Sequence, residues 1–165
     1  DVLIGVASNG PHTNGYSFLR KLFDWAPMDI VPPGFDVSLG DALLEPHRSY
    51  LDVLDAALAS GKVKALAHIT GGGLPENLPR VLPDGVDAEI ELGSWPRGPL
   101  FELVAELATG VDTHELHRML NMGIGMVVVA SPDDADAVQA TIAEETWRIG
   151  TLVPGQAGSR TVHLL

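Results

Sequence analysis

The 165-residue sequence contains no cysteine. Disulfide bonds, thiolate metal sites and cysteine nucleophiles are therefore excluded within it. Basic residues are also few, because 10 Lys and Arg stand against 22 Asp and Glu, a formal net charge of −12. Such a surface repels nucleic acid and anionic lipid, so we expect neither as a partner. A local pocket for a phosphorylated metabolite remains compatible with it.

The sequence also lacks a signal peptide and a long apolar run, which predicts a cytoplasmic protein that does not span a membrane. Its composition is that of a globular protein, with 45% hydrophobic and 19% charged residues. The length suits one domain over residues 1–165. Because a strand pattern starts almost at Asp1, which is not a Met, we expect a segment upstream to be missing.

Strand and helix patterns are mixed along the chain. Apolar runs and apolar–acidic alternation predict strands over residues 3–8, 65–69, 86–92 and 124–130. The spacing of apolar residues predicts helices over residues 16–23, 49–60, 100–108 and 113–120, with another capped by Ser131. Residues 25–40 are expected to be irregular, and 147–165 to form two short strands joined by a turn at 154–158. This order predicts an α/β or α+β fold with a mixed sheet.

Three glycine-rich turns stand out: a first turn at residues 8–15, a second at 68–73 and a third at 121–126. The first two lie between a predicted strand and a predicted helix. Glycine lets the backbone approach a ligand and point N–H groups at it, and a following helix favours phosphate. Glycine is equally common in purely structural turns, and neither of the first two turns matches a phosphate loop or a dinucleotide fingerprint. Both interpretations stay open on these patterns alone.

Polar side chains accompany the first two turns. His12 lies in the first turn, where an imidazole can work near neutral pH or simply bond the turn. His68 opens the second turn and fits either a ligand contact or an imidazole bonded to backbone. Glu76 and Asn77 follow the triple glycine and suit Mg²⁺ or ribose hydroxyls, or ordinary positions in a first helical turn.

No metal site is expected from the remaining histidines. His114 and His117 are three residues apart on a predicted helix, a spacing that can hold a metal, but no third ligand is evident and the surroundings look solvated. His47 and His163 belong to no recognisable group.

Five segments together resemble AIR synthetase, the phosphoribosylformylglycinamidine cyclo-ligase of purine biosynthesis. They are SNGPHTNGYS at 8–17, LLEPHRSY at 43–50, AHITGGGLPENLPR at 67–80, SWP at 94–96 and NMGIGM at 121–126. They occur in the family's order and cover the chain to about Gly150. Residues 25–40 and the tail after Gly150 match only loosely.

The resemblance implies that residues 1–165 are the enzyme's C-terminal domain, a three-layer α/β/α arrangement with a mixed sheet, partly ferredoxin-like. It implies a reaction in which ATP activates the formyl oxygen of formylglycinamidine ribonucleotide (FGAM), an amidine nitrogen attacks, and phosphate leaves to give AIR. The family's N-terminal domain, which holds most of the ATP and Mg²⁺ site, is absent from this sequence. The chain alone is therefore expected to be inactive, and the full-length enzyme to be a homodimer.

Carried onto this sequence, the resemblance assigns the first two turns to one wall of an interdomain cleft. His12 is expected to be catalytic, as an acid or a base, and no residue is expected to bind a metal. The residues expected to bind substrate or phosphate, or to support those that do, are Asn9, Gly10, Asn14, Gly15, His68, Gly71, Gly72, Gly73 and Asn77.

Other functions remain alternatives. Thiamine-monophosphate kinase, selenophosphate synthetase, a hydrogenase maturation protein and FGAM synthetase share the fold and the use of ATP, but the segments at 43–50 and 94–96 favour AIR synthetase. From a different class, the chain is compatible with a non-catalytic binding module. The intact polar turns argue against that alternative.

Overall fold

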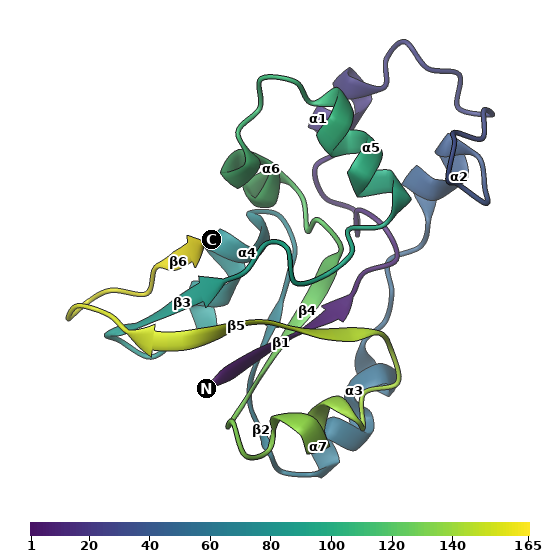
Figure 1. Cartoon of the computed structure of the whole chain (residues 1–165). Helices are drawn as coiled ribbons and strands as arrows, with labels where there is room; N and C mark the ends of the chain where they lie inside the picture. Colours follow the sequence, from purple (N-terminus) through teal and green to yellow (C-terminus); the bar gives the residue numbers. More distant parts are fainter.

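The computed structural model describes residues 1–165, and its centre is a six-stranded sheet in the order β2-β4-β1-β5-β3-β6 (Figure 1). The strands are β1 Val2–Ala7, β2 Val63–His68, β3 Val86–Ile90, β4 Ile124–Ala130, β5 Thr146–Pro154 and β6 Val162–Leu164. The helices are α1 Tyr16–Leu22, α2 Leu39–Leu44, α3 Leu51–Ala59, α4 Gly73–Asn77, the 3₁₀ helix η1 Leu78–Val81, α5 Pro99–Leu107, α6 Thr113–Met119 and α7 Ala135–Gln139. Neighbouring strands are antiparallel except β3 and β6, which are parallel. The predicted mixed sheet is confirmed.

Side chains of the central strands alternate between two apolar cores, as the two-residue period of a strand requires. On one face, Leu3 and Val127 join a core with residues of α4 and η1. On the other face, Ile4 and Val128 join a core with residues of α3 and α7. Helices therefore cover both faces of the sheet, as the resemblance implies.

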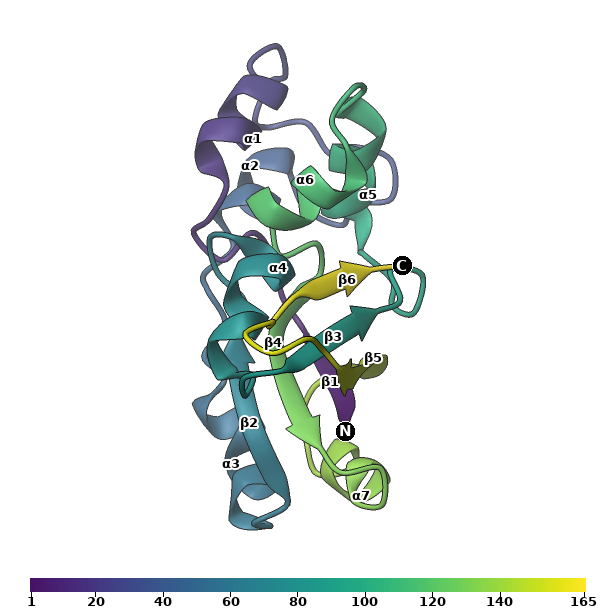
Figure 2. The same cartoon turned by 90° about the vertical axis from the view of Figure 1, so that its left-hand side faces the viewer.

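A third core lies beyond one end of the sheet, where α1, α2, α5 and α6 gather at the top of both views (Figures 1 and 2). Leu19, Leu100, Val104 and Leu116 are buried in it. Helix α5 begins with Pro99, whose missing N–H and fixed φ suit the first helical position. None of the helices combines the length and hydrophobicity needed to cross a bilayer.

Two helix boundaries differ from the prediction. Residues 25–40 are not wholly irregular, because α2 begins at Leu39 and Ser38 caps it. The helix predicted to follow Ser131 begins at Ala135, because the Ser131 hydroxyl first closes a turn by accepting a backbone N–H.

The C-terminal segment forms the two predicted strands, β5 and β6. They are not neighbours in the sheet, because β3 lies between them. Asp87, on the polar face of the strand predicted at 86–92, is only 8% exposed. Its Oδ1 accepts hydrogen bonds from Ser159 Oγ at 2.5 Å and Thr161 N at 2.7 Å, so the tail covers it.

Candidate functional site at one end of the sheet

The three glycine-rich turns meet at the end of the sheet that faces the helical core. Strand β1 ends where β4 begins, with Ala7 paired to Ile124. Strand β2 ends on the other side of β4, with His68 paired to Met126. Because β4 is antiparallel to both neighbours, its entry turn lies beside the exit turns of β1 and β2. Segments far apart in the sequence thus form one surface.

Asn121 ties the first turn to the third. Its Oδ1 accepts from Ser8 Oγ at 3.1 Å and from Gly123 N at 3.0 Å, and its Nδ2 donates to Gly10 O at 2.9 Å. The side chain is buried. The sequence prediction did not single out Asn121, although it lies within one of the five family segments.

Backbone strain concentrates in the same two turns. The chain's three non-glycine residues with positive φ are His12 at 51°, Thr13 at 62° and Met122 at 47°. A left-handed conformation costs a residue with a Cβ about 1–2 kcal/mol, and Thr, which is β-branched, adopts it rarely. Strain of this kind persists where surrounding contacts impose it, and it gathers at functional sites.

Asn9 fixes the tautomer of His12. Its Nδ2 donates to Pro46 O at 2.8 Å and to Glu45 Oε1 at 3.2 Å, so Oδ1 is the atom that faces His12. That oxygen also accepts from Arg48 N at 3.2 Å. Because an amide oxygen only accepts, the 2.6 Å contact favours the proton on His12 Nε2 and leaves a lone pair on Nδ1. The Asn9 backbone N–H, which lies 3.3 Å from the same nitrogen, is the longer and weaker competitor.

His12 is completely buried, and its Nδ1 has no hydrogen-bond partner. Burial, followed by the nearby charges of His47, His68 and Arg48, lowers the pKa of His12 to about 3. The imidazole is therefore neutral at pH 7. It is suited to accept a hydrogen bond rather than to deliver a proton.

His47 belongs to this site, so the prediction that it joins no group is wrong. Its ring stacks on His12 with centroids 4.1 Å apart, and its Nε2 lies 3.0 Å from His68 Nε2. His68 is exposed, so it is not the buried, backbone-bonded imidazole that was one of its two readings. Burial and then His47 lower the pKa of His68.

Gly125 in β4 makes room for this cluster. A Cβ at this position would lie 1.9 Å from Tyr50 Oη and 2.7 Å from His12 Cε1. The Tyr50 hydroxyl donates to Ala7 O at 2.6 Å. Two side chains thus cross the strand where only glycine leaves space, which explains the second glycine of the third turn.

All three glycines of the second turn were expected to bind phosphate, but only two of their backbone N–H groups are free. The N–H groups of Gly71 and Gly72 donate no hydrogen bond, whereas Gly73 N donates to Thr70 O at 2.9 Å. Gly73 also lies against α6, since a Cβ there would come within 1.7 Å of His117 O. Gly71 and Gly72 therefore fit an anion, while Gly73 is required for packing.

Asn77 supports the second turn from inside. It is 3% exposed, and its Nδ2 donates to Gly73 O at 2.8 Å and to Gly71 O at 3.1 Å. Its amide is thus used within the turn, which fits a supporting role and not direct ligand contact. Glu76 points the other way and pairs with Arg118 at 2.8 Å, which leaves it engaged rather than free for Mg²⁺.

Asn14 and Gly15 play different parts in the first turn. Asn14 Nδ2 donates to His12 O at 2.6 Å, and its Oδ1 lies over Gly71, 3.2 Å from where a Cβ would stand. That oxygen makes no hydrogen bond and joins the first turn to the second. Gly15, in contrast, packs on Leu120. A Cβ at position 15 would lie 2.3 Å from Leu120 Cδ2, so the role of Gly15 is structural.

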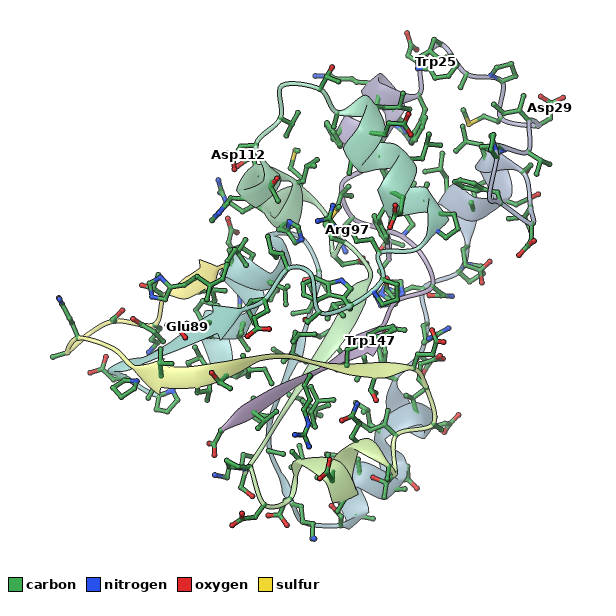
Figure 3. All side chains as sticks on the ribbon, viewed as in Figure 1. Trp25, Asp29, Glu89, Arg97, Asp112 and Trp147 are labelled. Carbon is green, nitrogen blue, oxygen red and sulfur yellow. The ribbon has the colours of Figure 1, made fainter.

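A cleft of about 380 Å³ opens beside the first turn, between α2 and the start of α5. Arg97, on the segment leading into α5, lines it and forms no ion pair, and Figure 3 shows it near the middle of the molecule. Gly10, a predicted ligand contact, also lines it. Its other lining residues are Ser8, Asn9, Gly34, Phe35, Asp36, Val37, Ala42, Glu45, Gly98, Pro99, Leu100 and Phe101.

Only one of the two histidines predicted on the helix at 113–120 lies in solvent. His117 is 1% exposed, its Nδ1 bonds Thr113 O at 2.8 Å, and Trp95 packs edge-on against it. His114 remains exposed on the surface of α6. The two imidazoles therefore face different environments.

Solved structures share this fold. A hydrogenase maturation protein, HypE from E. coli, matches with a TM-score of 0.61 and 20% identity, covering 99% of this chain and 45% of that one. A thiamine-monophosphate kinase from Stenotrophomonas maltophilia K279a matches with a TM-score of 0.58 and 15% identity, covering 99% and 49%. The chain thus has the architecture of one half of these proteins.

Sequence comparison identifies the family. The chain belongs to the family described as AIR synthase related protein, C-terminal domain, which matches residues 1–163. It is 46% identical over 155 residues to a phosphoribosylformylglycinamidine cyclo-ligase from Burkholderia cenocepacia, covering 92% of this chain and 44% of that protein. It is 46% identical over 167 residues to the enzyme of the same name from Nitrosococcus oceani, covering 98% and 46%. The chain thus spans about half the length of these relatives.

Proposed function

We propose that the chain is the C-terminal half of an ATP-dependent cyclo-ligase that converts FGAM to AIR in purine biosynthesis. The observation that carries the proposal is the convergence of three family turns on one surface with unused hydrogen-bonding groups. ATP is the co-substrate that activates the formyl oxygen for ring closure. The chain forms one wall of the active site, and the other half of the enzyme supplies most of the ATP site and Mg²⁺.

The residues on this wall suit distinct steps. Gly71 and Gly72 present free N–H groups to phosphate oxygens. Asn14 Oδ1 lies beside them and accepts from an amidine or ribose donor. His68 is the exposed imidazole and takes up a proton released on ring closure. His12, buried below, is a positioning residue that acts through its neighbours.

The test is turnover of the intact protein with FGAM and ATP. His68→Ala is expected to lower kcat by about 10²-fold or more, the usual contribution of a proton-transfer group. His12→Ala is expected to lower kcat with a smaller change in KM, and His12→Gln to recover part of the loss. His114→Ala, an exposed control on α6, keeps wild-type turnover. Wild-type turnover in His68→Ala and His12→Ala would remove both roles.

Substrate identity is tested by thermal shift of the intact protein. FGAM, AIR and ATP are expected to raise its melting temperature, because ligands of the folded state stabilise it. A response to thiamine monophosphate or selenide instead would move the assignment to another enzyme with this fold. The 46% identity to cyclo-ligases, against 15–20% for the structural relatives, supports the first outcome.

The proposal extends to the whole protein. The intact enzyme is a cytoplasmic homodimer that dimerises mainly through its other half, and the 165-residue chain by itself does not turn over FGAM. Production of AIR by the purified chain would contradict this division of labour.

A further inference from the structure

Three imidazoles from separate segments converge next to the first and second turns. His12, His47 and His68 each offer one ring nitrogen, and these three atoms all lie within 4.8 Å of one another. The segments are the first turn, the stretch between α2 and α3, and the end of β2. The proposed ligase chemistry gives His47 no task.

The spacing is close to that of ligands on one metal ion. Zinc–imidazole bonds are about 2.0–2.1 Å, so two nitrogens on a tetrahedral Zn²⁺ lie about 3.3 Å apart. His47 Nε2 and His68 Nε2 are 3.0 Å apart. His12 must approach them by no more than about 1.5 Å to complete the set. Because the rings of His12 and His47 are stacked, with planes 14° apart, the His47 ring must also turn before its lone pair points at the same ion. His47 lies outside any helix or strand, where the backbone can adjust.

The hydrogen bonding of His12 leaves it ready to bind a cation. Asn9 holds the proton on His12 Nε2 at 2.6 Å, in the manner of the oxygen atoms that orient metal-binding histidines from outside the coordination sphere. The lone pair on Nδ1 is buried and has no partner in the protein. A buried acceptor without a partner is rare and calls for an explanation.

We propose that His12, His47 and His68 form a three-histidine site for Zn²⁺. Neutral imidazoles suit Zn²⁺ well, and three protein ligands leave a fourth position open for water or a ligand atom. The inference goes beyond the proposed ligase function. Because zinc would take the lone pair of His68, the zinc-bound protein is a state distinct from the one in which His68 accepts a proton. Metal binding does not require FGAM, ATP or the other half of the active site.

The test is equilibrium dialysis of the intact protein against zinc chloride, with bound zinc measured by atomic absorption. His47→Phe keeps an aromatic ring stacked on His12 but removes both nitrogens. This variant is expected to bind one zinc ion fewer per chain. If the ion still binds, its affinity should fall by more than the about 10- to 100-fold that removal of an outer-sphere partner causes. His114→Phe, the same change at an exposed histidine, binds zinc as the parent does. Equal stoichiometry and affinity in the parent and His47→Phe would overturn the proposal.

Two further measurements guard against misfolding and confusion with catalysis. Circular dichroism compares the metal-free variants with the parent, and His68→Ala replaces His47→Phe if that variant does not fold, with the same expected loss of one zinc ion. Cobalt chloride is expected to give visible absorption of tetrahedral Co²⁺ in the parent and none in the variant. If the intact protein binds zinc through these histidines but has no ligase activity, only the proposed function fails. If it has ligase activity but binds no zinc through these histidines, only the metal site fails.

Discussion

Two regions at different ends of the sheet bury a titratable side chain in opposite ways. At the tail end, Asp87 Oδ1 receives donors from Ser159 and Thr161, and Oδ2 lies 3.4 Å from His163 Nε2. At the turn end, His12 Nδ1 has no partner. The N–H groups of Gly71 and Gly72 in the neighbouring second turn are free as well.

The difference separates stability from function. Buried polar groups are nearly always paired, and the tail end follows that rule. The turn end combines unpaired groups with left-handed backbone at His12 and Thr13. Backbone strain of this kind gathers at functional sites. His12 combines it with an unpartnered ring nitrogen, whereas the other such nitrogen, His117 Nε2, lies in the unstrained helix α6. The tail end therefore contributes to stability, and the turn end leaves polar groups free to meet a ligand.

The largest expected effect on the free energy of unfolding comes from adding a side chain to Gly73 in the second turn. Gly73→Ala places a Cβ 1.7 Å from a backbone oxygen of α6 at a φ of 57°. Overpacking together with left-handed strain is expected to cost about 3–4 kcal/mol, measured by urea unfolding. Gly110→Ala is the matched control, because its φ is 90° but nothing lies within 4 Å. It should cost about 1 kcal/mol. Similar losses in the two variants would refute the packing argument.

A smaller effect is expected at the tail end. The Ser159 hydroxyl, the Thr161 N–H and then His163 hold the pKa of Asp87 below its ordinary value of 3.8. The unfolded chain therefore takes up the proton first as pH falls, and the stabilisation present above pH 3.8 is lost as pH falls through the folded pKa. Asp87→Asn should lower the melting temperature at pH 7 and flatten its decline on acidification, as followed by calorimetry. The turnover of the intact protein should not change. An unchanged acid profile would show that the tail end is not held by this carboxylate.

The smallest expected effect relieves strain at the turn end. Thr13→Gly accepts the φ of 62° without a Cβ, but loses the bond from Thr13 Oγ1 to His12 O at 2.6 Å. The net gain in unfolding free energy is expected to be about 0.5 kcal/mol, measured by urea unfolding. Thr109→Gly, where φ is not positive, should lose stability. A loss of stability in Thr13→Gly would mean that the turn is not strained.

Local patterns in the sequence were enough to place most elements. The apolar run at 124–130 corresponds to β4, and the spacing at 16–23 to α1 within one residue. These patterns report burial of one strand or one helix face, which neighbouring residues largely determine. The three turns were also found, because glycine and polar residues cluster there in the sequence.

What the sequence could not show depends on contacts between distant segments. The sequence assigned His47 to no group because its partners, His12 and His68, lie 35 residues before it and 21 residues after it. Only the pairing of β4 with both β1 and β2 brings the three together. The apolar–acidic alternation over residues 86–92 puts Asp87 on the polar face of its strand, and this pattern cannot reveal a tail that arrives more than seventy residues later. The free and occupied amides of the second turn likewise depend on hydrogen-bond geometry, which residue types do not specify.

The two outer strands of the sheet have a consequence for behaviour in concentrated solution. An open strand edge is a template for aggregation unless it is short or charged. Strand β6 has only three residues, and β2 carries Lys64, paired with Asp1 at 2.6 Å. Both edges are thus poor templates, and the net charge of −12 adds mutual repulsion between copies. The two edges of the sheet thus help to keep copies of the protein apart in solution, at a distance from the glycine-rich turns.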